Sequence, residues 1–134
     1  MNEIKYTASA FVLNRENKVL LIWHKKFNKY VQPGGHINEN ELPHEAAIRE
    51  VFEETGINVD IPIKTPFAKE DYLNNVGHQV DYQYIGYAIN EDIHNNAESF
   101  KAGWFSLSDL ETIPVVEDLK DKFKYVLESI DTEK

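Results

Sequence analysis

The chain has 134 residues, of which 42% are hydrophobic and 28% are charged. This composition is that of an ordinary globular protein, and the length predicts a single domain over residues 1–134. A net charge of −9 argues against broad binding to DNA or RNA, which depends on many Lys and Arg contacts to phosphate. The chain has no cysteine, which excludes thiolate metal sites and cysteine nucleophiles.

The sequence shows no targeting or membrane signal. Its first residues lack the basic start and long apolar run of a secretory signal. The longest apolar stretch, Val19–Trp23, is far shorter than the roughly 20 residues that a bilayer-spanning helix needs. We therefore expect a cytoplasmic protein without a membrane partner.

The N-terminal region predicts a β-hairpin. Residues Tyr6–Leu13 place Ala8, Ala10 and Val12 at alternate positions, a pattern typical of a strand with one buried face. Lys18–His24 is a short apolar run with Val and Ile, which is typical of a buried strand. The polar residues between these two segments form the expected turn.

A turn and a helix are expected next. Pro33-Gly34-Gly35 is a strong turn signal. Helical residues then run from Pro43 to Thr55. Proline suits the first turn of a helix, because its missing N–H has no partner there, and Gly56 is a natural C-terminal stop.

The second half of the chain predicts strands and a second helix. Strands are expected at Ile57–Ile63, His78–Ile89 and Ala102–Phe105. Apolar residues at helical spacing predict a helix over Val115–Ile130. The order of strands, helix, strands and helix favours an α/β sandwich built on a mixed β-sheet.

The predicted helix at Pro43–Thr55 carries Glu50, Glu53 and Glu54 on one face, because each helical residue turns by about 100°. The opposite face is apolar and is expected to pack on the sheet. Carboxylates at these spacings repel one another. A solvated acidic face is one interpretation. The other is a site for a divalent cation such as Mg²⁺, which prefers carboxylate, carbonyl and phosphate oxygens.

The glycines before this helix help to decide between a solvated acidic face and a cation site. Gly34 and Gly35 allow the backbone to approach a ligand closely, and a free carbonyl there would be a further metal ligand. A Pro-Gly-Gly turn by itself is weak evidence for a site.

Together, these residues resemble the Nudix box, the family pattern G-x5-E-x7-R-E-U-x-E-E-x-G-U, where U is a bulky aliphatic residue. Every fixed position is filled in this sequence, by Gly35, Glu41, Arg49-Glu50-Val51, Glu53-Glu54, Gly56 and Ile57. The resemblance implies a Nudix-like α/β/α sandwich and a hydrolase that cleaves a nucleoside diphosphate linked to another moiety. It also implies Mg²⁺ or Mn²⁺ as cofactor, and it leaves a homodimer open.

The resemblance assigns roles to individual residues. It implies that Glu50, Glu53 and Glu54 hold the metal, together with the carbonyl of Gly34. Arg49 is expected to orient a metal-binding glutamate. Glu41 is expected to have an orienting role through a salt bridge.

Several residues outside the acidic face are candidates for substrate contact. The lysines Lys25 and Lys29 would attract phosphates. Gly35, His78 and Asp81 are further candidates, although a regular strand places the last two on opposite faces. The general base stays open between Glu53, Glu54 and the loop residue Glu98.

Four kinds of function are compared. The leading one is a pyrophosphohydrolase acting on a nucleoside triphosphate, ADP-ribose, a sugar nucleotide or a dinucleoside polyphosphate. The alternative is a catalytically silent Nudix domain that binds a nucleotide as a sensor, which predicts a degraded box where this one is intact. The related isoprenoid diphosphate isomerases rely on a cysteine, which the chain lacks. RNA decapping is disfavoured by the acidic charge.

Overall fold

The computed structural model describes residues 3–74, 77–94 and 101–131. Within these ranges, eight strands form one mixed sheet. The strands are β1 (Ile4–Leu13), β2 (Val19–His24), β3 (Lys29–Val31), β4 (Gly34–His36), β5 (Val59–Asp60), β6 (Ala68–Asn74), β7 (Gly77–Ala88) and β8 (Ala102–Phe105). The helices are α1 (Pro43–Thr55), the short 3₁₀ helix η1 (Asp109–Glu111) and α2 (Leu119–Asp131).

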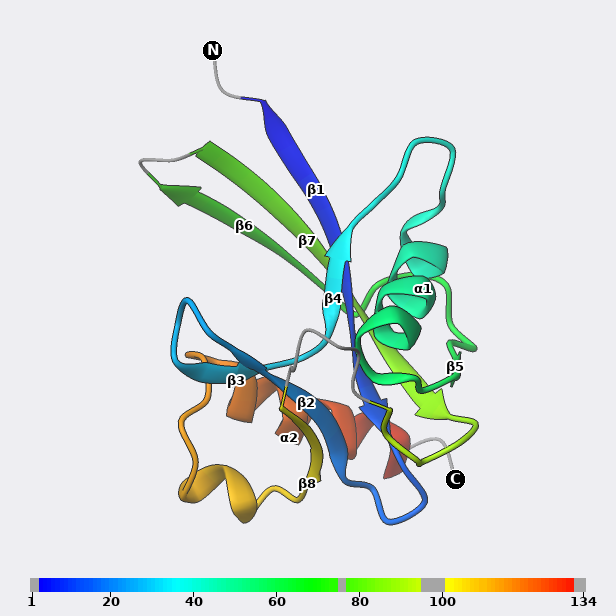
Figure 1. Ribbon diagram of the computed structural model, residues 1–134, viewed down its shortest axis with the longest axis vertical. Coiled ribbons are helices and arrows are strands. Elements are labelled where there is room, and N and C mark those ends of the chain that lie inside the picture. The colour runs from blue at the N-terminus through cyan, green and yellow to red at the C-terminus, as the bar shows by residue number, and fades with distance from the viewer. Residues whose placement is uncertain (1–2, 75–76, 95–100, 132–134) are drawn as a thin grey trace.

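The central strand is β1, which pairs with three others. It runs parallel to β7 in a register from Ile4 opposite His78 to Leu13 opposite Tyr87. It is antiparallel to β2, so the predicted hairpin is confirmed, and also to β4. In Figure 1, β1, β6 and β7 lie side by side and extend toward the top of the view, beyond β2 and β3.

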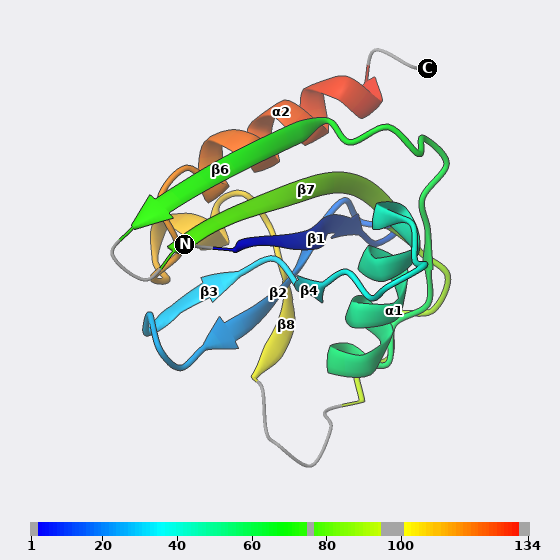
Figure 2. The same ribbon diagram turned by 90° about the horizontal axis from the view of Figure 1, so that it is seen from above.

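The two faces of the sheet carry separate hydrophobic cores, because successive side chains of a strand point to opposite faces. Ala8, Ala10 and Val12 of β1 belong to the core that contains the α1 residues. Phe11 and Leu13 belong to the core that contains the α2 residues. Figure 2 shows the helices on opposite sides of the sheet, which confirms the predicted α/β sandwich.

Helix α1 has the predicted bounds. Its first turn is capped by the carboxylate of Glu45, which accepts a hydrogen bond from the backbone N–H of Leu42 at 2.9 Å. Gly56 ends the helix in the left-handed conformation, with φ of 76°, where glycine has no steric penalty. Phe52 extends past the buried stripe and stays 51% exposed.

Three predictions on the strands were wrong or incomplete. The strand β6 was missed, because it is an edge strand with many polar residues that pairs only with β7. The strand at Ile57–Ile63 is confined to Val59–Asp60, since Pro62 has no N–H for the sheet. Residues 33–35 were predicted as a turn, but the two glycines lie in β4 and pair with β1.

The start of the C-terminal helix was also placed four residues too early. Helix α2 begins at Leu119, not at Val115. Residues 114–116 are extended instead, because Tyr30 donates its N–H to the Pro114 carbonyl at 2.8 Å and accepts the Val116 N–H at 3.2 Å. None of the described helices is long and apolar enough to span a bilayer.

We predict that Phe123→Ala destabilises the protein by about 3–5 kcal/mol, because the ring is fully buried between α2 and the sheet and its removal leaves a cavity. Urea unfolding measures the change. The neighbouring exposed residue provides the control, since Lys124→Ala should stay within about 0.5 kcal/mol of the native protein. Equal effects of the two substitutions would contradict this packing of α2.

Candidate active site

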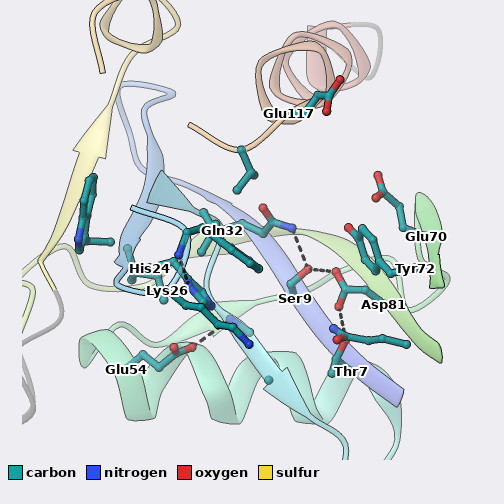
Figure 3. A pocket seen from close by; sticks show the side chains of 18 of the residues that line it. Thr7, Ser9, His24, Lys26, Gln32, Glu54, Glu70, Tyr72, Asp81 and Glu117 are labelled. Carbon is teal, nitrogen blue, oxygen red and sulfur yellow. Dashed lines mark hydrogen bonds between the residues drawn. The ribbon is translucent and has the colours of Figure 1, made fainter. Parts of the chain in front are cut away.

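A cavity of about 810 Å³ opens between the α2 face of the sheet, the β2–β3 loop and the glycine strand β4. Figure 3 shows its polar lining, with Glu54 and Lys26 on one side and Asp81 and Glu70 on the other. A cavity of this size is typical of small-molecule sites, which span roughly 300–1,000 Å³.

The side chain of Arg49 binds three glutamates at once. Its Nε donates to Oε2 of Glu41 at 2.8 Å, and Nη2 donates to Oε1 of the same carboxylate at 3.1 Å. Its Nη1 donates to Glu50 at 2.9 Å and to Glu53 at 2.8 Å. The remaining Nη2 hydrogen bond goes to the His36 carbonyl at 2.8 Å. Arginine therefore fixes the acidic face and ties it to the end of β4.

The salt bridge that the resemblance implied for Glu41 is present, with Arg49 as its partner. The hydrogen bonds from Arg49, with smaller contributions from Asn38 and from charge attraction, hold the pKa of the Glu41 carboxyl below its usual value. The same contacts raise the pKa of the Arg49 guanidinium. Both groups are therefore held in their charged forms.

Glu54 is the acidic-face residue that lines the cavity. Its Oε1 accepts the backbone N–H of Gly34 at 3.0 Å, so the end of α1 is connected directly to β4. Burial raises the pKa of its carboxyl to about 8, helped by the charges of Glu50 and Glu53 and opposed by the Gly34 hydrogen bond. Glu54 thus holds a proton much more readily than an ordinary glutamate.

Both glycines of β4 are required by close contacts. A Cβ on Gly35 would lie 2.5 Å from the carboxyl carbon of Glu50. A Cβ on Gly34 would collide with the backbone carbonyl oxygen of Ala8 and with Ser9. The missing side chains let the helix carboxylates reach the edge of the cavity.

The residues present fit a hard divalent cation by their chemistry. Glu50 and Glu54 each use Oε1 in a hydrogen bond, and within the described residues no donor contacts either Oε2. Glu53 lies further out, with its side chain 50% exposed and paired to Arg49. No group of three or more acidic or histidine side chains in the described chain already stands at metal-binding distances.

The structure brings only some of the other predicted site residues to the cavity. Lys25, Gly35 and Asp81 line it. Lys29 is not among the lining residues and lies exposed on the edge strand β3. His78 points to the other face of β7 and pairs with Asp71 at 2.8 Å, as the strand alternation predicted. Glu98 lies outside the described residues.

Sequence reasoning missed the polar residues contributed by the sheet. Thr7 and Ser9 line the cavity from β1, and Glu70 and Tyr72 line it from β6. The signal for the first pair was present, because polar residues alternate with Ala8 and Ala10 along the same strand. The β6 residues gave no such signal, since that strand was not predicted.

A family model described as the NUDIX domain matches residues 4–126. The match includes the glycine strand, the whole acidic face of α1 and most of α2. The chain therefore belongs to the Nudix hydrolase family.

Curated relatives match different parts of the chain. A 61-residue segment, 44% of this chain, is 41% identical to a putative 8-oxo-dGTP diphosphatase from Bacillus subtilis and covers 41% of that protein. The chain thus spans less than half the length of this relative. A probable DHNTP pyrophosphohydrolase from Lactococcus lactis is 27% identical over 132 residues, which cover 92% of this chain and 74% of that protein.

Solved structures of other proteins have the same fold as this chain. A NUDIX family hydrolase from Clostridium perfringens superposes with a TM-score of 0.78 at 29% identity, covering 94% of this chain and 97% of that one. An Ap4A hydrolase from C. elegans, in a binary complex, has a TM-score of 0.78 at 18% identity and covers 97% and 99% of the two chains. At that identity the second likeness shows the fold alone.

We predict that substitution by alanine has different consequences at the two glycines of β4. Gly34→Ala should destabilise the fold by about 1–3 kcal/mol, because its Cβ meets the rigid backbone of β1. Gly35→Ala should leave stability nearly unchanged, because it meets the movable end of Glu50, but it should displace that carboxylate. Thermal unfolding measures both, and a larger loss of stability for Gly35→Ala would contradict this account.

We predict that the metal-free protein loses stability as the pH rises from about 5 to 8. The Glu54 carboxyl has a folded pKa of about 8, against an ordinary value of 4.5. Between these values the folded state binds more protons than the unfolded state, so raising the pH favours unfolding. Urea unfolding in EDTA at several pH values measures the effect.

Glu54→Gln should remove most of this pH dependence, because glutamine does not titrate. Glu128→Gln, on the exposed face of α2, is the matched control and should leave it unchanged. An identical pH profile for Glu54→Gln and the native protein would show that Glu54 does not cause it.

Proposed function

We propose that this protein is a metal-dependent pyrophosphohydrolase that cleaves a nucleoside diphosphate linked to another moiety. The observation that carries the proposal is the place of Glu54. Its half-buried carboxylate faces the cavity beside Gly34, on the same helix face as Glu50 and Glu53. A carboxylate set at the edge of a ligand-sized cavity suits a reaction on a phosphate held by a cation.

The charges around the cavity support binding of a diphosphate at this end. Lys25 and Lys26 line the cavity from the β2–β3 loop, and Figure 3 shows Lys26 on the side that includes Glu54. Their ammonium groups attract phosphate oxygens across a surface that is acidic overall. His24, which stacks on Phe27 with ring centroids 4.2 Å apart, lies at the base of the same loop.

The acidic residues would hold Mg²⁺ or Mn²⁺ through Glu50 and Glu54, with Glu53 and the Gly34 carbonyl as further donors. Such a cation neutralises phosphate oxygens and lowers the pKa of a bound water. Arg49 keeps Glu50 and Glu53 in place through its hydrogen bonds. The Gly34 N–H holds one oxygen of Glu54, which leaves the other directed to ligands.

In the proposed reaction, a water oxygen forms a bond to phosphorus and the bridging P–O bond breaks. The products are a nucleoside monophosphate and the phosphorylated leaving group. Glu54 is our candidate for the carboxylate that takes the proton from water, because it lines the cavity. Glu53 is the second candidate, and Glu98 is the third.

The names of the relatives favour a nucleoside triphosphate or a similar triphosphate as substrate, since one is a putative 8-oxo-dGTP diphosphatase and another a probable DHNTP pyrophosphohydrolase. We propose the same class for this chain. The alternative, a silent nucleotide-binding sensor, is disfavoured because all the acidic residues of the box are present. Arg49 holds Glu41, Glu50 and Glu53, and the Gly34 N–H holds Glu54.

A panel of nucleoside triphosphates, ADP-ribose, sugar nucleotides and dinucleoside polyphosphates, incubated with Mg²⁺, tests the proposal. We expect release of a nucleoside monophosphate from at least one class, and loss of turnover in EDTA. Absence of turnover on every substrate, with folded protein and Mg²⁺ or Mn²⁺ present, would favour the sensor.

Glutamine variants separate the candidate bases. The base should lose about 10²–10⁴-fold in kcat when replaced, with little change in KM. We expect this for Glu54→Gln, and Glu128→Gln should retain full activity. If Glu98→Gln lowers kcat by this amount and Glu54→Gln does not, the assignment to Glu54 is wrong.

A further inference from the structure

The cavity wall formed by β6 has less backbone support than the wall formed by β1, which has strands on both sides. In the described chain, β6 pairs only with β7. It contributes Glu70 and Tyr72 to the lining of the cavity, as Figure 3 shows. An edge strand has hydrogen bonds to a neighbour along one side only. The position of this wall therefore depends on the contacts that its side chains make.

Two carboxylates lie opposite each other in the pairing of β6 with β7. Glu70 is the partner of Asp81 in the antiparallel register, and both residues line the cavity. Asp81 is 7% exposed and is fixed by hydrogen bonds from Thr7, at 2.8 Å, and Ser9, at 2.9 Å. Like charges directly opposite on paired strands destabilise the pairing. Because Asp81 is fixed, this repulsion acts to displace the edge strand that carries Glu70.

The ammonium group of Lys122, on α2, neutralises Glu70. In this ion pair the side chain of Lys122 is 19% exposed and that of Glu70 is 26% exposed. Burial lowers the pKa of the Lys122 ammonium, so a charge at this place is costly unless a carboxylate accompanies it. Lys120 on the same helix also forms an ion pair, but the side chain of its partner Glu111 is 59% exposed. The Lys122 pair is thus the more deeply buried of the two.

A second contact from α2 supports the same end of β6. Tyr125 stacks on Phe67, with ring centroids 5.9 Å apart and an angle of 18° between the rings. Tyr125 follows Lys122 by three residues, so the two side chains share one helix face, and Phe67 directly precedes β6. Figure 2 shows α2 running alongside β6. Helix α2 therefore holds the edge strand at two points, by stacking before the strand and by charge within it.

We infer that Lys122 is a positioning residue for the substrate cavity. It is not among the described residues that line the cavity, so it acts through Glu70, whose charge it neutralises and whose strand it ties to α2. Tyr72 lies two residues further along the same face of β6 and is held in place with Glu70. This inference rests on the proposed function. The glutamates proposed to hold the metal lie on α1, so the effect falls on substrate binding and not on the chemical step.

Steady-state kinetics with the triphosphate that is hydrolysed fastest tests the positioning role. Lys122→Met should raise KM by about tenfold and leave kcat within about twofold, because it weakens binding of the substrate and of the transition state equally. Lys122→Arg keeps the charge and should keep the native KM. Lys120→Met removes the exposed ion pair of the same helix and is the matched control, with native KM and kcat.

A double variant tests whether Lys122 acts through Glu70, and it covers the case in which Lys122→Met fails to fold. Glu70→Gln combined with Lys122→Met leaves no uncompensated charge in the pair and removes the repulsion from Asp81. Its KM should therefore lie between the values of the native protein and of Lys122→Met. A KM in the double variant that equals or exceeds that of folded Lys122→Met would overturn the inference, and so would a native KM in Lys122→Met.

Hydrogen exchange of the full chain provides a readout that does not require turnover. The amides of β6 should exchange at least about tenfold faster in Lys122→Met, while those of β1 and α1 keep their native rates, because only the edge strand loses its attachment to α2. Equal acceleration in all strands would show that Lys122 contributes only to global stability, which would overturn the inference.

The two measurements separate this inference from the proposed function. Turnover of a triphosphate with unchanged KM in folded Lys122→Met would overturn the positioning role and leave the hydrolase standing. Selective acceleration of β6 exchange, in a protein that hydrolyses nothing, would support the attachment of β6 through Lys122 and overturn the hydrolase.

Discussion

The repulsion between carboxylates on one face of α1 is the constraint on which the site depends. Glu50, Glu53 and Glu54 lie within little more than one turn of helix, and their mutual repulsion by itself destabilises the helix. Arg49 offsets this repulsion, because it donates hydrogen bonds to Glu50 and Glu53 and also forms a salt bridge with Glu41. One guanidinium thereby links the helix to the preceding loop, and the Glu54 carboxyl is left without a cationic partner among the described residues.

Glu54 shows how this balance produces a reactive group. It is half-buried, it has no ion pair among the described residues, and its N–H partner is a backbone group of β4. Burial and the neighbouring carboxylates raise its pKa to about 8. Its place by the cavity depends on Gly34 and Gly35, because a Cβ at either position would occupy the space that the strand and the carboxylates share.

The cavity itself has two chemically different ends. Lysines and the acidic face of α1 define one end, where we propose phosphate chemistry. The Asp81 cluster of β1 and β7 defines the other, where Thr7, Ser9 and Gln83 donate hydrogen bonds to the carboxylate.

The sequence by itself determined the acidic helix, because the spacing of Glu50, Glu53 and Glu54 and the stops at Pro43 and Gly56 are local properties. It also predicted the hairpin and the sandwich. Only the tertiary structure decided which side chains share the cavity. Asp81 was brought beside Thr7 by a parallel pairing of strands more than 70 residues apart in the sequence. Lys29 and His78 were left outside it, since sheet pairing and register, which set where each side chain points, are not local.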